Sequence, residues 1–537
     1  MSRIRKAAVN AVFGYSQFAI AIASGIVLVP LTLHRVGATS YGLWLASGEI
    51  LGHAGMVELG VLGVLPWLIA EADGKSDRAG MRRLVGNAVA VATFVGALYL
   101  ALASAGWAFL PGLLHLTAAE RASIYGPLAI LVIANAVGYP LRVFSAVLSG
   151  LQDVYFNGAL TLITTAAGVS ITAVLIVKGY LLYALAVGAA LPSTSALFAG
   201  LYRVHVIAPD LLRGWPRPSL AEIRPLFKNG AGVWLGTMGW ALLSATNGIV
   251  ITFLGHPEWV AVYAVMSKLS TMSTQVSWIL PDSGLVGLAQ LYGEHREASR
   301  LRHVALMMLR LHLLLAGAAA CGVLAFNPAF VTRWVGGGFF AGLPLNALLA
   351  ATIVCSSLIH GLIATASVLG NRLRVGSIAL VNGIVQAALS LLFGYWWGLV
   401  GIAAAGILAG VVTAIPFGIV LLKPSTQLTL RDLLRDLLWP WFYRIAPIAV
   451  AAATVGFFYR VGIVASAALT EVVLLWYVWQ MRAQYAHLPS DPRISVWLAR
   501  FGLVTPVEPA AAASAAASIA GPASAGVAAA AAVLEQP

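Results

Sequence analysis

A series of fourteen apolar runs, separated by short breaks with charged residues, glycine or proline, constrains the fold more than any other feature. An apolar run of about 20 residues is long enough to cross a bilayer as an α-helix. Only 9% of the 537 residues are charged and the mean hydropathy is +0.90. Soluble domains carry about 25% charged residues. The sequence therefore predicts an all-α, polytopic membrane protein.

The predicted spans form two sets of six and a final pair. The first set is 8–32, 41–69, 84–112, 122–148, 155–177 and 180–207, the second is 227–254, 259–283, 303–326, 341–369, 375–395 and 398–422, and the pair is 440–459 and 462–482. We interpret 1–207 as an N-terminal six-helix bundle, 208–226 as a cytoplasmic linker, 227–425 as a C-terminal six-helix bundle, 426–485 as two additional transmembrane helices, and 486–537 as a cytoplasmic tail, Ala/Ser-rich and disordered from about residue 504.

A faint internal repeat favours two halves of the same topology around a central cavity. Gly25-Ile26-Val27 precedes Tyr41 much as Gly248-Ile249-Val250 precedes Tyr263. Repeats with the same topology are related by an axis along the membrane normal. Chance matches in helices rich in alanine and glycine are the alternative explanation.

The distribution of basic residues predicts the orientation. With the N-terminus in the cytoplasm, 26 of the 32 Lys and Arg residues fall in inner segments, five fall in outer segments and Lys268 lies within a span. Cytoplasmic loops of membrane proteins carry an excess of Lys and Arg. We therefore expect both termini to be cytoplasmic, and we attribute the net charge of +13 to these loops rather than to nucleic-acid binding.

The sequence lacks the signatures of catalysis and of metal binding. Gly336-Gly337-Gly338 is not followed by the Lys-Ser or Lys-Thr of a phosphate-binding loop, and the ten histidines show no metal-ligand spacing. Cys321 and Cys355 both lie in apolar runs. We predict a protein that is not an enzyme and that holds no cofactor or metal.

The second span carries three ionisable residues. Glu49 and His53 are four residues apart and share one helix face, and Glu58 lies nearer the cytoplasmic end. Ionisable groups inside a span are costly unless they face protein or water. We interpret all three as candidates for binding a coupling ion, H⁺ or Na⁺. The alternative is an interhelical hydrogen-bonded pair or, for Glu58, a charge at the inner rim.

The eighth span carries a polar stripe that begins at Lys268, near the middle of the membrane. Thr271, Gln275, Trp278 and Asp282 fall within about 80° of Lys268 around a helix. We interpret Lys268 and Gln275 as substrate-binding residues and Asp282 as an ion-coupling residue. An ion pair between Lys268 and Glu49 is the alternative.

Three further polar residues lie in or near the ends of spans. Arg142 is predicted either to extend to the inner interface or to line the cavity and bind substrate. Asn247 is predicted either to bind substrate or to form an interhelical hydrogen bond. Glu471 is predicted to form a packing contact between the last two helices and the core.

Several short motifs resemble those of the Wzx-type polysaccharide flippases, a family in the superfamily of multidrug exporters and lipid II flippases. They are Pro30 in the first span, Tyr41-Gly42, Glu58-Leu59-Gly60 where the family more often has Asp, Tyr263 with Lys268 and Pro281, and Trp334 before a glycine-rich loop. The resemblance covers about residues 8–425.

The resemblance implies transport of a polyprenyl-pyrophosphate-linked oligosaccharide across the bacterial cytoplasmic (inner) membrane by alternating access, for surface polysaccharide biosynthesis. The polysaccharide polymerase machinery would then be a partner. A multidrug/cation exporter and a lipid II flippase are alternatives in the same superfamily. A membrane glycan polymerase or ligase is a less favoured alternative, because such enzymes usually need a large outer loop and the predicted outer loops are short.

Overall fold

The computed structural model describes residues 3–54, 60–113, 116–151, 153–215, 217–244, 246–283, 285, 288, 298–369 and 372–485. These residues form helices, turns and short connections, and no strand occurs among them. Nine of the described helices are long and apolar enough to cross a membrane, or ten if one bent pair is counted as a single span. The predicted all-α, polytopic membrane fold is confirmed.

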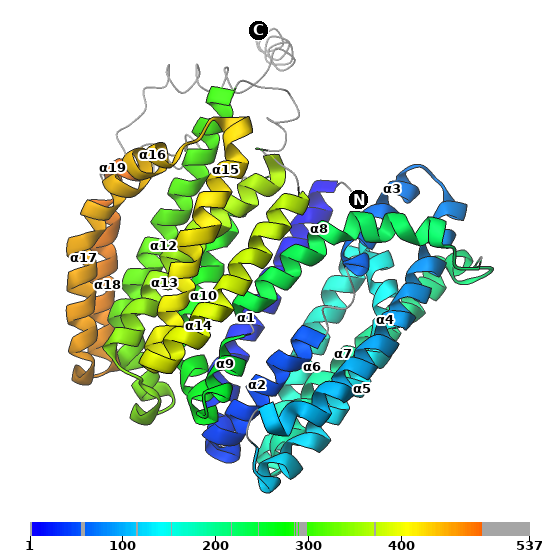
Figure 1. Ribbon diagram of the computed structural model, residues 1–537, viewed down its shortest axis with the longest axis horizontal. Helices are drawn as coiled ribbons and strands as arrows, with labels where there is room; N and C mark the ends of the chain where they lie inside the picture. The colour runs from blue at the N-terminus through cyan, green and yellow to red at the C-terminus, as the bar shows by residue number, and fades with distance from the viewer. Residues whose placement is uncertain are drawn as a thin grey trace, which may run out of the picture.

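The N-terminal half contains seven helices for six predicted spans. They are α1 (Arg3–Val36), α2 (Ala38–Ala54), α3 (Val61–Gly74), α4 (Arg78–Leu113), α5 (Ala118–Gly150), α6 (Val154–Val177) and α7 (Leu181–Ile207). Helix α7 packs between α5 and α6, α4 packs on α5, and α1 packs on α6 (Figure 1).

The C-terminal half follows a short 3₁₀ turn, η2 (Pro209–Leu212). Its helices are α8 (Leu220–Ser244), α9 (Asn247–Phe253), α10 (Pro257–Ser283), α12 (Ala298–Trp334), α13 (Leu343–Leu369), α14 (Arg372–Ala409) and α15 (Ile415–Thr426). Helix α14 turns sharply at Gly398. Its first part corresponds to the predicted span 375–395, and its second part, with the π-helical turn η4 (Gly410–Ala414) and α15, corresponds to the predicted span 398–422. Helices α12 and α13 pack on each other and on α10, and α14 packs on α8. The division into two six-helix bundles stays a prediction.

The prediction of one continuous second span at 41–69 is wrong. Helix α2 ends at Ala54, and α3 begins after Gly60, whose φ of 73° is in the left-handed region that favours glycine. A side chain at Gly60 would also collide with the carbonyl of Gly230 in α8. The two helices therefore have different main neighbours. Helix α2 packs mainly on α9 and α10, with smaller contacts to α4, α5 and α8, whereas α3 packs mainly on α4, α5 and α8.

The seventh predicted span, 227–254, is also two helices. Helices α8 and α9 meet at an angle of 45°. Helix α8 begins beside α3 and α4 and then runs along α14 (Figure 1). The N-terminus of α9 is thereby placed inside the bundle, where its first N–H groups have no partner within the helix.

The segment between the two halves is docked on α4. Leu211 is fully buried with Met81 and Val85 of that helix. The Asn87 side chain accepts a hydrogen bond of 3.2 Å from the Ser219 backbone N–H. The predicted linker thus has fixed contacts with the N-terminal half.

Two further long helices, α17 (Trp439–Phe457) and α18 (Ile463–Gln480), pack against α12. The Tyr477 hydroxyl is buried and donates a hydrogen bond of 2.8 Å to the Leu314 carbonyl. A side chain at Gly317 would collide with Tyr477, so the glycine allows this close approach. The predicted packing role of Glu471 is wrong, because Glu471 is exposed. Tyr477, two turns further along α18, makes the contact instead.

A short polar segment leads into α17. Helix α16 (Leu430–Asp432) starts with a capping box, in which Thr429 and Asp432 bond each other's backbone N–H groups. Arg302 lies 2.8 Å from the Asp432 carboxylate. Hydrogen bonds from the Thr429 hydroxyl and backbone N–H, and then the Arg302 charge, hold the pKa of Asp432 below its usual value.

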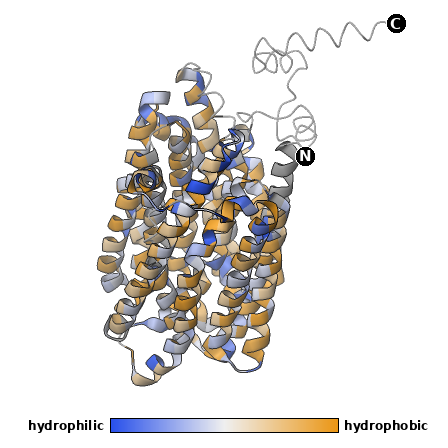
Figure 2. Ribbon diagram, turned by 90° about the vertical axis from the view of Figure 1, so that its right-hand side faces the viewer, coloured by the Kyte–Doolittle hydropathy of each residue, from blue (hydrophilic) through white to orange (hydrophobic). Residues whose placement is uncertain are grey.

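The hydrophobic residues follow the helices over most of their length, as a bilayer requires, and the more hydrophilic residues gather toward the end where the N-terminus lies (Figure 2). The helix pair α17–α18 lies at one edge of the molecule (Figure 1). The predicted tail, 486–537, lies outside the described residues.

Candidate functional site

Helix α10 occupies the centre of the candidate site, because it contacts α2, α9, α12 and α13. It begins at Pro257. Proline is favoured in the first turn of a helix, because the backbone N–H groups of that turn have no acceptor within the helix and the N–H that proline lacks is not needed there. At Gly42 of α2, a side chain would collide with the Pro257 carbonyl. The glycine of the Tyr41-Gly42 motif therefore lets α2 and α10 approach closely.

Lys268 extends from α10 toward α1. A Cβ atom added at Gly25 of α1 would lie 2.9 Å from Lys268 Cε and 3.2 Å from Nζ. The lysine is half-buried, and within the described part of the chain it has no ion pair, so the predicted pair with Glu49 does not form. A charged ammonium group therefore lies at the contact between α1 and α10, with none of the described carboxylates beside it.

The same stretch of α1 contacts the C-terminal half a second time. The Trp334 indole N–H, at the end of α12, donates a hydrogen bond of 2.7 Å to the Ile26 carbonyl. In a regular helix this carbonyl would accept from residue 30, but Pro30 has no N–H. Trp334 therefore supplies the donor that Pro30 lacks, so one motif residue satisfies the carbonyl group that another motif residue, 304 positions earlier, leaves without a donor.

Glu49 connects α2 to α9. Its carboxylate accepts a hydrogen bond of 3.0 Å from the Ile249 backbone N–H, and Gly248 lies directly against it. A carboxylate is stabilised at a helix N-terminus, where N–H groups and the positive end of the helix dipole are found. The break between α8 and α9 thus creates the environment that stabilises Glu49 in the membrane.

Asn247, the first residue of α9, lies beside Tyr263 of α10, at 3.5 Å between the amide nitrogen and the hydroxyl oxygen. It makes the interhelical contact that was one of its two predicted roles. The breaks at Gly60 and Thr246 thus let α2, α9 and α10 meet around Glu49, Asn247 and Tyr263.

Arg142 does not extend toward the nearer end of α5. Its guanidinium donates a hydrogen bond of 2.8 Å to Asn135, seven residues earlier in the helix, and lies 4.7 Å from the centre of the Tyr139 ring. The interpretation that Arg142 extends to the inner interface is therefore wrong. The side chain is half-buried beside its own helix in the N-terminal half, far in sequence from the polar residues of α10.

Of the other predicted site residues, the structure describes the side chain of Gln275 but not those of His53 and Glu58. Gln275 is exposed on α10. His53 lies in α2, and its side chain is outside the described part of the structure, as is the whole of Glu58.

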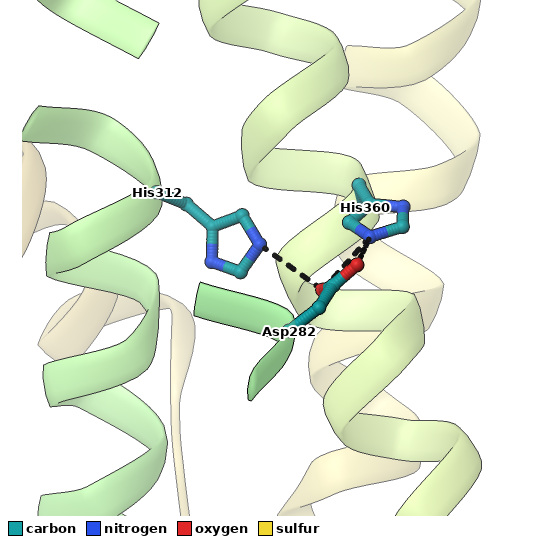
Figure 3. Close-up of side chains that lie close together, drawn as sticks. All are labelled: Asp282, His312 and His360. Carbon is teal, nitrogen blue, oxygen red and sulfur yellow. Dashed lines mark hydrogen bonds and ion pairs between the residues drawn. The ribbon is translucent and has the colours of Figure 1, made fainter. Parts of the chain in front are cut away.

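Asp282, near the end of α10, lies between two histidines from other helices (Figure 3). His360 Nε2 of α13 is 3.0 Å from each carboxylate oxygen, and His312 Nε2 of α12 is 3.8 Å from Oδ1. His312 is fully buried, whereas Asp282 and His360 are partly exposed. The ligand atoms of the three side chains all lie within 4.8 Å of one another.

Sequence reasoning identified Asp282 but missed His312 and His360. The three residues come from three helices, and the two histidines are 48 positions apart, so no spacing motif exists. The available signal was the presence of single histidines deep within apolar runs, where an unpartnered polar ring is costly.

Comparison with protein-family models and with curated proteins finds no match. Among solved structures, the chain is similar to the lipid II flippase MurJ in an inward closed conformation, with a TM-score of 0.63, 12% identity, and coverage of 87% of this chain and 98% of that chain. It is also similar to an inward-facing multidrug resistance MATE family transporter of the MOP superfamily, with a TM-score of 0.60, 16% identity, and coverage of 77% and 96%. The outward-facing conformation of a MATE family transporter of this superfamily is similar with a TM-score of 0.53 and 15% identity. That match covers 79% of this chain and 96% of the other chain. At these identities the similarity shows the fold.

Proposed function

We propose that this protein is a flippase that moves a polyprenyl-pyrophosphate-linked oligosaccharide across the bacterial cytoplasmic membrane by alternating access, for surface polysaccharide biosynthesis. The observation that carries the proposal is Lys268, a cation at the contact between α1 and α10 with no ion pair among the described residues. An ammonium group binds a pyrophosphate through charge-assisted hydrogen bonds. The shared fold of lipid-flipping and drug-exporting transporters supports a transport role.

The extent of the structural similarity favours a flippase over a multidrug exporter. The match to MurJ covers about 467 residues of this chain, so it extends past Ser425 beyond α15. The match to the inward-facing MATE transporter covers 96% of that transporter but only 77% of this chain, so about a quarter of this chain has no counterpart in it. The larger share of this chain that is matched thus supports the comparison with a lipid flippase. A multidrug exporter remains the second candidate, on the strength of the MATE similarity.

The proposed substrate contacts are Lys268 and Gln275 on α10, Asn247 on α9 and Arg142 on α5. Lys268 would bind the pyrophosphate, and the polar groups would bind the sugar. Arg142 lies in the N-terminal half and the others lie in the C-terminal half, so a substrate that touches both would sense their relative movement. Glu49, with His53 and Glu58 beyond it in the chain, is the proposed site for a coupling ion.

Replacement of Lys268 tests the proposed anion site. Lys268→Met keeps the length of the side chain and removes its charge, so we expect normal protein levels and loss of flipping, whereas Lys268→Arg should retain partial activity. Lys178→Met, which removes an exposed lysine at the end of α6, is the matched control and should remain active.

Full flipping by Lys268→Met would remove the anion site from the proposal. Because Lys268 and Glu49 do not pair, adding Glu49→Gln to Lys268→Met should not restore activity. Restoration would show instead that the two residues form a structural ion pair.

The proposed location is the inner membrane with both termini in the cytoplasm. A reporter fused after Gly74, in the turn between α3 and α4, should be cytoplasmic. A reporter fused after Arg121, near the start of α5, should be on the outer side. The opposite result at both sites would overturn the orientation.

A further inference from the structure

In the cluster of Asp282, His312 and His360, one ring nitrogen of His312 accepts no hydrogen bond from the described residues. His312 Nδ1 is 2.9 Å from the Met308 carbonyl oxygen. A carbonyl only accepts, so Nδ1 carries the proton, and in the neutral ring Nε2 carries a lone pair. This Nε2 atom is fully buried and has no hydrogen-bond partner among the described residues. A carboxylate oxygen of Asp282, which also presents lone pairs, lies 3.8 Å away.

A buried lone pair that faces a partly exposed carboxylate is unfavourable, and a cation between the two groups would relieve this. Metal-binding histidines usually donate their second ring N–H to a backbone carbonyl, which fixes the tautomer and aims the other nitrogen at the metal. The bond from His312 to Met308 has this form, and Figure 3 shows the rings of His312 and His360 converging on Asp282 from opposite sides.

The second histidine is also held in a fixed orientation. The Trp278 ring stacks on His360, with centroids 4.0 Å apart and planes at 2°. The Trp278 indole N–H donates a hydrogen bond of 3.1 Å to Ser357, one turn before His360 in α13. His360 Nε2 therefore remains directed at Asp282 without help from a ligand.

The spacing of the three groups suits a small cation. Zinc binds imidazole nitrogen and carboxylate oxygen at about 2.0–2.2 Å, which puts tetrahedral ligands roughly 3.3–3.5 Å apart. The observed separations from Asp282 oxygens, 3.0 Å to His360 and 3.8 Å to His312, lie on either side of that value. Small shifts of side chains, with release of the proton that His360 Nε2 donates to Asp282, would thus complete three ligands.

We propose that Asp282, His312 and His360 bind a divalent transition-metal cation of the zinc class, with a fourth position open to water or another ligand. Two imidazoles and one carboxylate favour zinc over magnesium, which prefers oxygen ligands. The bound ion joins the end of α10 to α12 and α13. It therefore fixes the end of the helix that carries Lys268, 14 residues earlier.

Zinc titration of the purified full-length protein, without an oligohistidine tag, tests the proposal by calorimetry. We expect one zinc ion per chain, with magnesium showing no comparable binding. Asp282→Asn, His312→Gln and His360→Gln should each weaken zinc binding at least tenfold. His303→Gln, which removes an exposed histidine from the same helix as His312, is the matched control and should bind as the wild type does.

A second measurement covers the case in which a ligand variant fails to fold. Cobalt added to the wild-type protein should give the intense visible absorption of a four-coordinate site, and zinc should displace it. Absence of zinc binding in the wild type, or equal binding by wild type and all three folded variants, would overturn the proposal. A proton on His312, without a metal, would then neutralise Asp282. Because the readout is metal binding, the result is independent of whether the protein flips a lipid.

Discussion

The hydrogen bond from Trp334 to the Ile26 carbonyl allows a sharp test of how α1 is attached to the C-terminal half. Trp334→Phe removes the indole N–H and keeps an aromatic ring that can stack on Phe330, whose ring centre is 4.9 Å away. Leaving a carbonyl without its partner costs about 1–3 kcal/mol. A cost of about 2 kcal/mol would lower the melting temperature by roughly 4 °C, at about 2 °C per kcal/mol for a large domain.

Pro30→Ala provides the second arm of the test. An alanine at position 30 restores the backbone N–H that the Ile26 carbonyl lacks within α1. We therefore expect Trp334→Phe to cost about 2 kcal/mol when Pro30 is present and well under about 1 kcal/mol when alanine replaces the proline. The loss of indole packing is the same in both backgrounds, so it cancels in the cycle.

Thermal unfolding of the four detergent-solubilised proteins, followed by size-exclusion chromatography with fluorescence detection, measures this coupling. If Trp334→Phe lowers stability equally in both backgrounds, Trp334 contributes through packing alone, and the carbonyl freed by Pro30 is not what it stabilises.

Three further predictions concern other contacts. Glu49→Ala should lower thermal stability by about 2 kcal/mol, because the partly buried Ile249 N–H loses its partner, whereas Glu258→Gln at a partly exposed site should change it by less than about 0.5 kcal/mol. Equal effects of the two substitutions would contradict the capping role of Glu49. Gly25→Val should displace the Lys268 ammonium and reduce transport without loss of protein in the membrane, and unchanged transport would show that this contact is unimportant. Because the pKa of Asp432 is lowered in the folded protein, its contribution to stability is present above the unfolded-state pKa, about 4, and is lost as pH falls further. The wild type should therefore lose more thermal stability than Asp432→Asn between about pH 5 and pH 3, and parallel pH curves would contradict this.

The general architecture could be predicted from sequence because the bilayer imposes strong rules on composition. Apolar runs and basic loops predicted a polytopic helical protein, and Lys268 was notable because a charge deep in a span requires a specific environment. Such features depend on local sequence and on the properties of the membrane.

The breaks within predicted spans and the contacts between side chains of different helices depend on tertiary packing, so they could not be predicted from local sequence. Gly60 begins α3 in a left-handed conformation where α8 crosses beside it, and that approach is not encoded near residue 60. Arg142 and Glu471 were assigned wrong surroundings because an apolar run does not show which face meets lipid and which meets protein. Asp282 acquired its two histidine neighbours only when three helices packed together.

The most direct test of the central proposal is analysis of lipid-linked glycans in a strain that lacks this protein. The proposal predicts that a polyprenyl-pyrophosphate-linked oligosaccharide accumulates on the cytoplasmic leaflet, that the wild-type gene clears it, and that the Lys268→Met variant does not. Absence of any accumulated lipid-linked oligosaccharide, together with increased sensitivity to cationic drugs, would contradict the proposal and favour a multidrug exporter.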